Sequence, residues 1–266
     1  MKDITLGQFF PGDTVAHRLD PRTKLILVVL FIVALFLAKS YISYGVMTLT
    51  VALCVAVSRI SLRTIVRSLK PLLIILIFTT ILNMFYTDGR ILVKFWIFKI
   101  TAEGIIRAAQ MLLRIVLLIT GTFLLTYTTS PIALTDGLES LFSPLKKIRF
   151  PVHELAMMMS IALRFIPTLV EETDKIMSAQ KARGASFDTG KLTERAKALL
   201  PLLVPLFVSA FRRADELAVA MECRCYHGGE GRTRMKVLTM AARDWIALVL
   251  FAALLAGMIV LRHFGL

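Results

Sequence analysis

Five long apolar blocks constrain this chain more than any other feature of its sequence. They cover residues 25–38, 41–57, 72–86, 105–128 and 245–261. A helix needs about 20 mostly apolar residues to cross a bilayer, so each block, with its flanking residues, approaches or reaches that length. Hydrophobic residues make up 57% of the chain, against roughly 45–50% in a soluble domain. We therefore predict an all-α integral membrane protein with about five transmembrane helices.

The positively charged residues are concentrated in three regions. Of the 32 Lys and Arg residues, four lie in residues 1–24, four in 59–70 and 17 in 130–243. Cytoplasmic loops of membrane proteins are rich in Lys and Arg, so these regions are predicted to lie inside the cell. The net charge of +14 is attributed to this asymmetry and to attraction by anionic lipid, and no nucleic-acid partner is expected. Residues 1–24 contain three aspartates and no apolar core, so no signal peptide is expected.

Charge and hydropathy together divide the chain into three predicted parts. Residues 1–129 would form a membrane domain with about four spans, and residues 244–266 a last transmembrane helix. Residues 130–243 are assigned to a cytoplasmic module of amphipathic coupling helices, because their apolar runs are short or interrupted by Arg164 and by prolines. Residues 87–104 partly alternate apolar and polar side chains, which predicts a short hairpin or an interfacial segment with Trp96 at headgroup level.

Polar residues and cysteines inside the predicted spans are few. Arg107, Gln110 and Arg114 share one face of the fourth block. Arg114 lies deeper in the block than Arg107, and a structural contact within the helix bundle is the expected role for it. Cys54, in the second block, is expected to be a small buried hydrophobic residue. Three cysteines without framework spacing argue against a disulfide-based fold.

The predicted cytoplasmic module has the periodicity of three helices, over residues 152–165, 167–182 and 201–225. The first contains Met157, Met158 and Met159, which suit either a core or an adaptable contact surface. The third contains an apolar stripe at helical spacing, which includes Leu206, Phe207, Ala210 and Ala214.

The second and third of these helices end alike, each with an arginine next to small residues. Arg183 stands within Ala182-Arg183-Gly184, and Arg224 stands within Cys223-Arg224-Cys225. Gly184 is a natural helix-terminating residue, and Gly228-Gly229 could terminate the third helix. One arginine at a helix C-terminus is common, because it interacts favourably with the helix dipole. Two matched ends favour docking of these arginines into acidic grooves of a cytosolic partner.

Several short motifs also carry a family resemblance. They are His17 to Lys24, Thr129-Ser130-Pro131, Pro144-Leu145-Lys146, Ala162 to Pro167 and Ala182-Arg183-Gly184-Ala185. In these motifs the chain resembles the transmembrane T component of energy-coupling factor transporters, and the resemblance covers most of its length. Ala182-Arg183-Gly184 is similar to the first of that family's two Ala-Arg-Gly coupling motifs. Cys223-Arg224-Cys225 stands in the place of the second and retains its arginine.

The resemblance implies a coupling subunit of a bacterial importer for a vitamin or a transition-metal ion, located as a multi-pass protein in the cell membrane. Two cytosolic ABC-type ATPases would bind the two coupling motifs, and a membrane-embedded substrate-binding subunit would rest on the coupling helices. We assign the platform for that subunit to Met157, Met158, Met159, Leu163, Leu206, Phe207, Ala210 and Ala214. The partner ATPases would use ATP, so no catalytic residue, metal or directly bound cofactor is expected in this chain.

Two other functions are compatible with parts of the sequence. A stand-alone permease would need polar side chains facing one another across the bundle, and only Arg114, Gln110 and Asn83 qualify. An intramembrane metalloenzyme could use Glu171-Glu172. A metal could also bind Cys223, Cys225 and His227, with Glu222 or Glu230 as a further ligand, although this spacing matches no standard zinc site. The sequence contains no Walker A motif, catalytic triad or Rossmann glycine pattern.

Overall fold

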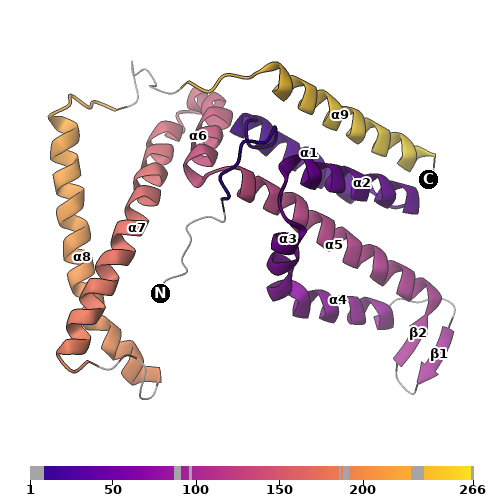
Figure 1. Ribbon diagram of the computed structural model, residues 1–266, viewed down its shortest axis with the longest axis horizontal. Coiled ribbons are helices and arrows are strands. Elements are labelled where there is room, and N and C mark those ends of the chain that lie inside the picture. Colours follow the sequence, from indigo (N-terminus) through magenta and orange to yellow (C-terminus); the bar gives the residue numbers. More distant parts are fainter. Residues whose placement is uncertain are drawn as a thin grey trace. The chain divides into compact units, whose positions relative to one another are not determined.

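The computed structural model describes residues 9–86, 91–95, 98–185, 187, 192–228 and 237–264. Within these ranges the regular structure is helical apart from one short hairpin, which confirms the predicted all-α class (Figure 1). The chain forms two compact units. The bundle unit comprises Gly7–Gly137 and Leu238–Leu266, and the central unit comprises Met1–Leu6 and Leu138–Val237.

The bundle unit contains the first helices of the chain and the last one. They are α1 (Pro21–Leu37), α2 (Tyr41–Ser58), α3 (Leu62–Leu69), the 3-10 helix η1 (Lys70–Leu72), α4 (Leu73–Tyr86), α5 (Ala102–Thr128) and α9 (Ala242–His263). α6 (Pro131–Phe142) begins in this unit and ends in the central unit. Side-chain oxygens start four of these helices by accepting backbone N–H groups: Asp20 for α1, Ser40 for α2, Ser61 for α3 and Thr101 for α5.

α1 and α5 are the helices around which the bundle unit packs. α1 lies along α9 and against α5, and α2 and α4 also pack on α5. Side chains from α1, α2, α3, α5 and α9 meet in one apolar cluster, which includes Phe31, Leu35, Met47, Leu117 and Met258. Large apolar residues on the outer faces, such as Val33, Leu53 and Val249, are exposed. Such faces suit a bundle that is surrounded by lipid.

Among the residues that the structure describes, five helical stretches are long and apolar enough to cross a membrane. They are Tyr41–Ser58, Leu62–Met84, Glu103–Thr128, Val152–Ala182 and Ala242–His263. The number agrees with the sequence prediction, but two members differ. α1 contributes only 17 residues, whereas α7 (Val152–Ala182) in the central unit qualifies by length and composition.

The expectation of three helices in the central unit is wrong. Together with the 3-10 helix η2 (Ser143–Ile148), that unit contains two long helices, α7 and α8 (Leu192–Glu222), of 31 residues each. Pro167 was predicted to begin a new helix, because proline has no N–H to continue the hydrogen-bond ladder. It lies instead inside α7, which faces α8 on both sides of the proline, through Phe165 and Glu172. The packing of the two helices therefore outweighs the loss of one backbone hydrogen bond.

Residues 91–101 confirm the predicted hairpin. Strand β1 (Ile91–Phe95) pairs antiparallel with β2 (Phe98–Thr101), and Phe95 stands opposite Phe98 in the register. β2 leads directly into α5, whose first turn is capped by Thr101. Trp96, predicted at headgroup level, lies outside the described residues.

A buried polar junction ties the chain's first helix to its last. The carboxylate of Asp244, 1% exposed, accepts the Asp20 N–H at 2.8 Å and the Ala241 N–H at 2.8 Å. Lys24, also buried, donates to the Thr128 carbonyl at 2.8 Å and so joins the start of α1 to the end of α5. The side chain of Arg22 donates to the Leu238 carbonyl at 3.2 Å. The N-terminal residues that carried the family resemblance thus lock three helix ends together.

Arg114 has the structural role that its depth predicted. Its guanidinium donates to the Ala38 carbonyl at 2.9 Å and lies 5.9 Å and 5.7 Å from the ring centres of Phe36 and Tyr44. Ala38 follows the last residue of α1, where the helix leaves carbonyls unpaired. Arg114 therefore fastens the turn between α1 and α2 to α5.

Replacing Asp244 with Ala tests the polar junction. Because it leaves two backbone N–H groups without their acceptor, the free energy of unfolding should fall by about 2–5 kcal/mol. Unfolding of the purified protein by SDS in mixed micelles would measure this change. Asp215→Ala, at an exposed position of α8, is the matched control and should change the value by less than about 0.5 kcal/mol. Equal effects of the two variants would contradict the role given to Asp244.

Candidate coupling site on the central unit

α7 ends at the first candidate motif in a glycine-dependent cap. Gly184 has φ +86°, and its N–H bonds the Lys181 carbonyl at 3.0 Å. The next N–H, of Ala185, bonds the Gln180 carbonyl at 3.0 Å. This pair of bonds is the Schellman motif, which satisfies carbonyls that the helix end leaves free. Arg183 is the last residue before the left-handed position, and its side chain is exposed.

α8 ends with the same backbone geometry at the second candidate motif. The Cys225 N–H bonds the Glu222 carbonyl at 2.9 Å, and the Tyr226 N–H bonds the Met221 carbonyl at 3.1 Å. Cys225 takes the left-handed position with φ 55°, so it corresponds to Gly184, and Arg224 corresponds to Arg183. Arg224 is exposed as well. The two motifs therefore match in backbone, although only the arginine is common to their sequences.

The expected helix terminator of α8 needs correction. Gly228-Gly229 was the expected pair, yet the helix has already ended when the chain reaches Gly228, and Gly229 lies outside the described residues. The sequence did not identify Cys225, because a residue with a Cβ takes the left-handed conformation at a cost of about 1–2 kcal/mol. The spacing from Arg224 was the available signal, since Gly184 stands at the same distance from Arg183.

α7 and α8 cross as an antiparallel pair (Figure 1). At one end of the contact, the Gln180 side chain donates to the Pro201 carbonyl at 3.4 Å. Further along, Arg213 forms an ion pair with Glu172 at 2.8 Å, and Ser209 donates a short hydrogen bond to the same carboxylate. The numbers rise along one helix as they fall along the other. Arg183 and Arg224 therefore lie at opposite ends of the pair, roughly 35 Å apart along the axis at 1.5 Å per residue.

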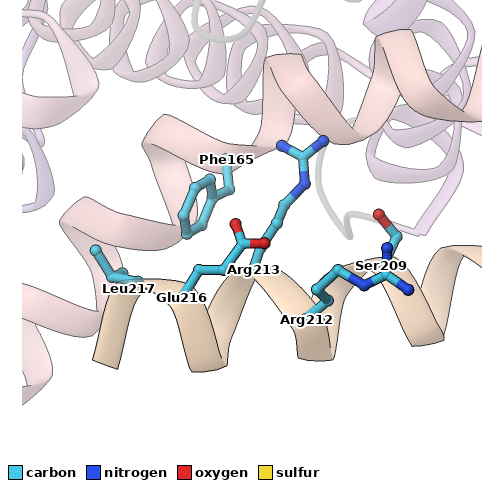
Figure 2. Close-up of a pocket in the computed structure, with 6 residues that line it drawn as sticks. All are labelled: Phe165, Ser209, Arg212, Arg213, Glu216 and Leu217. Atoms are coloured by element: carbon cyan, nitrogen blue, oxygen red, sulfur yellow. The ribbon is translucent and has the colours of Figure 1, made fainter. Parts of the chain in front are cut away.

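A shallow depression of about 480 Å³ marks the middle of this crossing. Figure 2 shows Phe165 pointing from α7 toward α8, and Arg213 rising from α8 toward α7, with Glu216 and Leu217 nearby. Glu172 is already held by Arg213 and Ser209, and Glu171 is exposed. Glu172 is thus engaged in helix packing while Glu171 points away from that contact, and the two carboxylates do not form one site.

The proposed platform residues are divided between exposed and half-buried positions. Met158 and Met159 are 55% and 50% exposed, and Phe207, Ala210 and Ala214 are exposed too. Met157, Leu163 and Leu206 are half-buried. α8 also exposes apolar residues that were not assigned to the platform: Leu199, Leu200, Leu203, Val204, Val208 and Phe211. Their helical spacing was visible in the sequence, but it does not distinguish a face that packs within the chain from one that stays open.

The alternative sites gain no support from the geometry. Within the residues the structure describes, no three His, Cys, Asp or Glu side chains are arranged to hold a metal, and Glu230 lies outside those residues. Asn83 donates to the Thr79 carbonyl of its own helix, Arg114 binds Ala38, and Gln110 lines an open groove between α2 and α5. The three polar residues considered for a permease therefore do not form a common substrate site.

The two caps can be tested by exchanging their left-handed residues. Gly184→Ala should lower the free energy of unfolding by about 1 kcal/mol through its backbone alone, because no atom lies within 4 Å of the added Cβ. Cys225→Gly should raise it by a similar amount, and Cys223→Ala should leave it nearly unchanged. Hydrogen exchange of the last turn of each helix is the measurement. Faster exchange at α8 in Cys225→Gly would contradict the assignment.

Comparison with known proteins identifies the family. The family model CbiQ, described as a cobalt transport protein, matches residues 12–237 of this chain. The energy-coupling factor transporter transmembrane protein EcfT of Thermosediminibacter oceani is 52% identical over 98% of this chain and 99% of its own length. Proteins with the same name from Clostridium kluyveri and Bacillus subtilis are 54% and 49% identical, over 93% and 96% of this chain and 92% and 98% of their own lengths.

These relatives and the apolar helices agree on location and class. The helices of spanning length and the membrane components named among the relatives make this a multi-pass protein of a bacterial cell membrane. The chain therefore belongs to the CbiQ family, with the EcfT transmembrane components of energy-coupling factor transporters as its relatives, as the motifs around Arg183 indicated.

Proposed function

We propose that this chain is the coupling subunit of an energy-coupling factor importer, and that it transmits ATP-driven motion of two cytosolic ATPases to a substrate-binding membrane subunit. The observation that carries the proposal is the matched pair of capped helix ends. Each end presents one exposed arginine directly before a left-handed residue. Two like ends on one chain fit two like partners.

Arginine is suited to this docking role for physical reasons. Its planar guanidinium binds a carboxylate through two parallel hydrogen bonds, which fixes orientation as well as position. The Schellman cap makes the end of each helix rigid, so little conformational freedom is lost when the arginine binds. An acidic groove on an ATPase would therefore hold Arg183 or Arg224 together with the last turn of its helix.

Transmission follows from the antiparallel packing of α7 and α8. The Glu172–Arg213 ion pair, the Ser209 hydrogen bond and the contact around Phe165 and Leu217 join the helices between their two docking ends. A displacement imposed at Arg183 would move α7 against α8, and the ion pair would pass the motion on. The two packed helices would thus transmit motion between the docking ends at Arg183 and Arg224.

The open apolar surfaces suit the second partner. Met158 and Met159 on α7 and Phe207 on α8 are exposed, and methionine adapts its shape to different surfaces. A hydrophobic substrate-binding subunit embedded in the membrane would rest on these side chains. One platform could then serve more than one such subunit, and the substrate would be a vitamin or a transition-metal ion. The family name, cobalt transport protein, agrees with the second class.

In this assignment the chain has no catalytic role. ATP would bind to and be hydrolysed by the partner ATPases, and this chain would bind no cofactor directly. Of the Glu171-Glu172 pair of the rival metalloenzyme function, Glu172 is already held in the ion pair with Arg213.

The double variant Arg183→Glu/Arg224→Glu tests the docking role. Reversing both charges should reduce binding of the ATPases by at least about 30-fold per site, because each arginine is treated as a binding hot spot. Co-purification of the ATPases from membranes that contain equal amounts of this chain measures the loss. Lys175→Glu/Arg212→Glu changes two exposed cations of the same helices away from their ends and should retain the ATPases. Intact, active complexes from the first variant would refute the proposal.

A charge exchange tests transmission separately from docking. Arg213→Glu alone should lower substrate uptake severalfold while the ATPases still co-purify, because two carboxylates would then face each other between α7 and α8. Adding Glu172→Arg should restore much of the uptake. Uptake of labelled substrate into proteoliposomes gives the readout. Equal loss in the single and double variants would show that the ion pair does not carry the motion.

A further inference from the structure

α3 (Leu62–Leu69) is a short amphipathic helix with two kinds of exposed side chain, apolar and cationic. Its buried residue, Ile65, belongs to the apolar cluster of the bundle unit, and Ser68 shares a short hydrogen bond with Tyr127 of α5. α3 is therefore fixed to the bundle on one side. Leu62 and Val66, one turn apart, are 71% and 66% exposed.

Four cations accompany these exposed apolar residues. Arg59, Arg63, Arg67 and Lys70 are all exposed, and they recur at intervals of three or four residues. Among the described residues, no ion pair joins any of the four to a carboxylate. The fold neither buries nor neutralises this charge, so charge complementarity calls for an anionic ligand.

The connections of α3 restrict where that ligand can be. α2 ends at Ser58, and α4 begins at Leu73 after the three-residue helix η1. α2 has the length and composition of a membrane span, and α3, η1 and α4 together form the next such stretch, Leu62–Met84. Figure 1 shows α3 and α4 meeting at an angle. The cations of this stretch, Arg63, Arg67 and Lys70, all lie in its α3 and η1 part, which places α3 at the edge of the bilayer.

We propose that α3 is a binding site for anionic phospholipid. Arg63 and Arg67 hold the headgroup phosphate, Arg59 and Lys70 extend the positive surface, and Leu62 and Val66 enter the acyl region. Arginine pairs with phosphate in a bidentate manner, and a basic cluster next to a span is typical of sites for anionic lipid. An amphipathic helix binds such an interface through its apolar residues as well as its charges.

A protein partner is the other possible occupant, and the structure favours lipid. An acidic protein surface would explain the cations but would leave two large aliphatic side chains in water. The lipid interface accommodates both, because charges lie at headgroup level while apolar side chains reach the acyl chains. Because the connections to α2 and α4 hold α3 next to the bilayer, the lipid interface is already present there without any protein partner.

Local quenching of a tryptophan measures lipid preference at this site. The reporter is Val66→Trp in a Trp96→Phe/Trp245→Phe background, reconstituted with brominated phosphatidylglycerol or brominated phosphatidylcholine. We expect stronger quenching by phosphatidylglycerol at equal mole fraction, with the preference reduced by salt. In Arg63→Gln/Arg67→Gln the preference should fall by roughly fivefold for each arginine removed, until the two lipids quench equally.

Two further variants separate charge from fold and position. Arg63→Lys/Arg67→Lys keeps the charge and should keep most of the preference. Lys39→Gln/Arg107→Gln removes two exposed cations elsewhere in the bundle unit and should leave it unchanged. Equal quenching by both lipids in the reporter protein with Arg63 and Arg67 unchanged would overturn the proposal. A preference for phosphatidylglycerol that survives in Arg63→Gln/Arg67→Gln would overturn it as well. So would loss of the ATPases in that variant when the reporter protein shows no lipid preference, because the cations would then bind a protein.

Discussion

One buried carboxylate determines how the bundle unit closes. Asp244 binds the N–H groups of Asp20 and Ala241, so the start of α9 is fixed against the start of α1, more than 200 residues earlier in the chain. A carboxylate in an apolar environment is costly unless its oxygens are hydrogen-bonded, and here each oxygen has a backbone donor. Lys24 adds the end of α5 to the same point. The apolar packing of α1 along α9 depends on this alignment, because lipid-facing helices have little hydrophobic drive to associate.

The central unit is organised by its helix ends and by one ion pair. Both long helices end in the same hydrogen-bonded cap, and Glu172–Arg213 sets how they cross. The docking and transmission proposed for this unit use these features and no substrate site. This division of roles fits a subunit whose chemistry is carried out by partners.

Much of the bundle unit could be predicted from hydropathy. α2 begins at Tyr41, where the second apolar block begins, and Arg114 makes the structural contact expected of a deep arginine. Asp244 could not be singled out, because its two partners follow from the fold and not from sequence spacing. The predicted helix boundary at Pro167 was wrong for a different reason. The local preference of proline to end a helix is outweighed there by the packing of α7 against α8.

The arginines of the candidate site could be predicted from the sequence, but the backbone conformation at the second helix end could not. Arg183 and Arg224 follow from spacing, and the structure places both at exposed helix ends. The left-handed conformation of Cys225 was hidden, because cysteine has no preference for it. The open apolar face of α8 was also missed in part, since periodicity alone cannot tell which stripe meets another helix.

The antiparallel crossing of α7 and α8 has a geometric consequence. Two antiparallel helices with like ends have an approximate two-fold axis through the middle of their contact, even though one chain supplies both. The two ATPases proposed as partners would therefore meet this single chain as if it were symmetric, each facing an equivalent helix end. The equivalence breaks on both sides of the arginine, where Ala182 and Gly184 on one end correspond to Cys223 and Cys225 on the other. These differences would let the two proposed partners distinguish one end from the other.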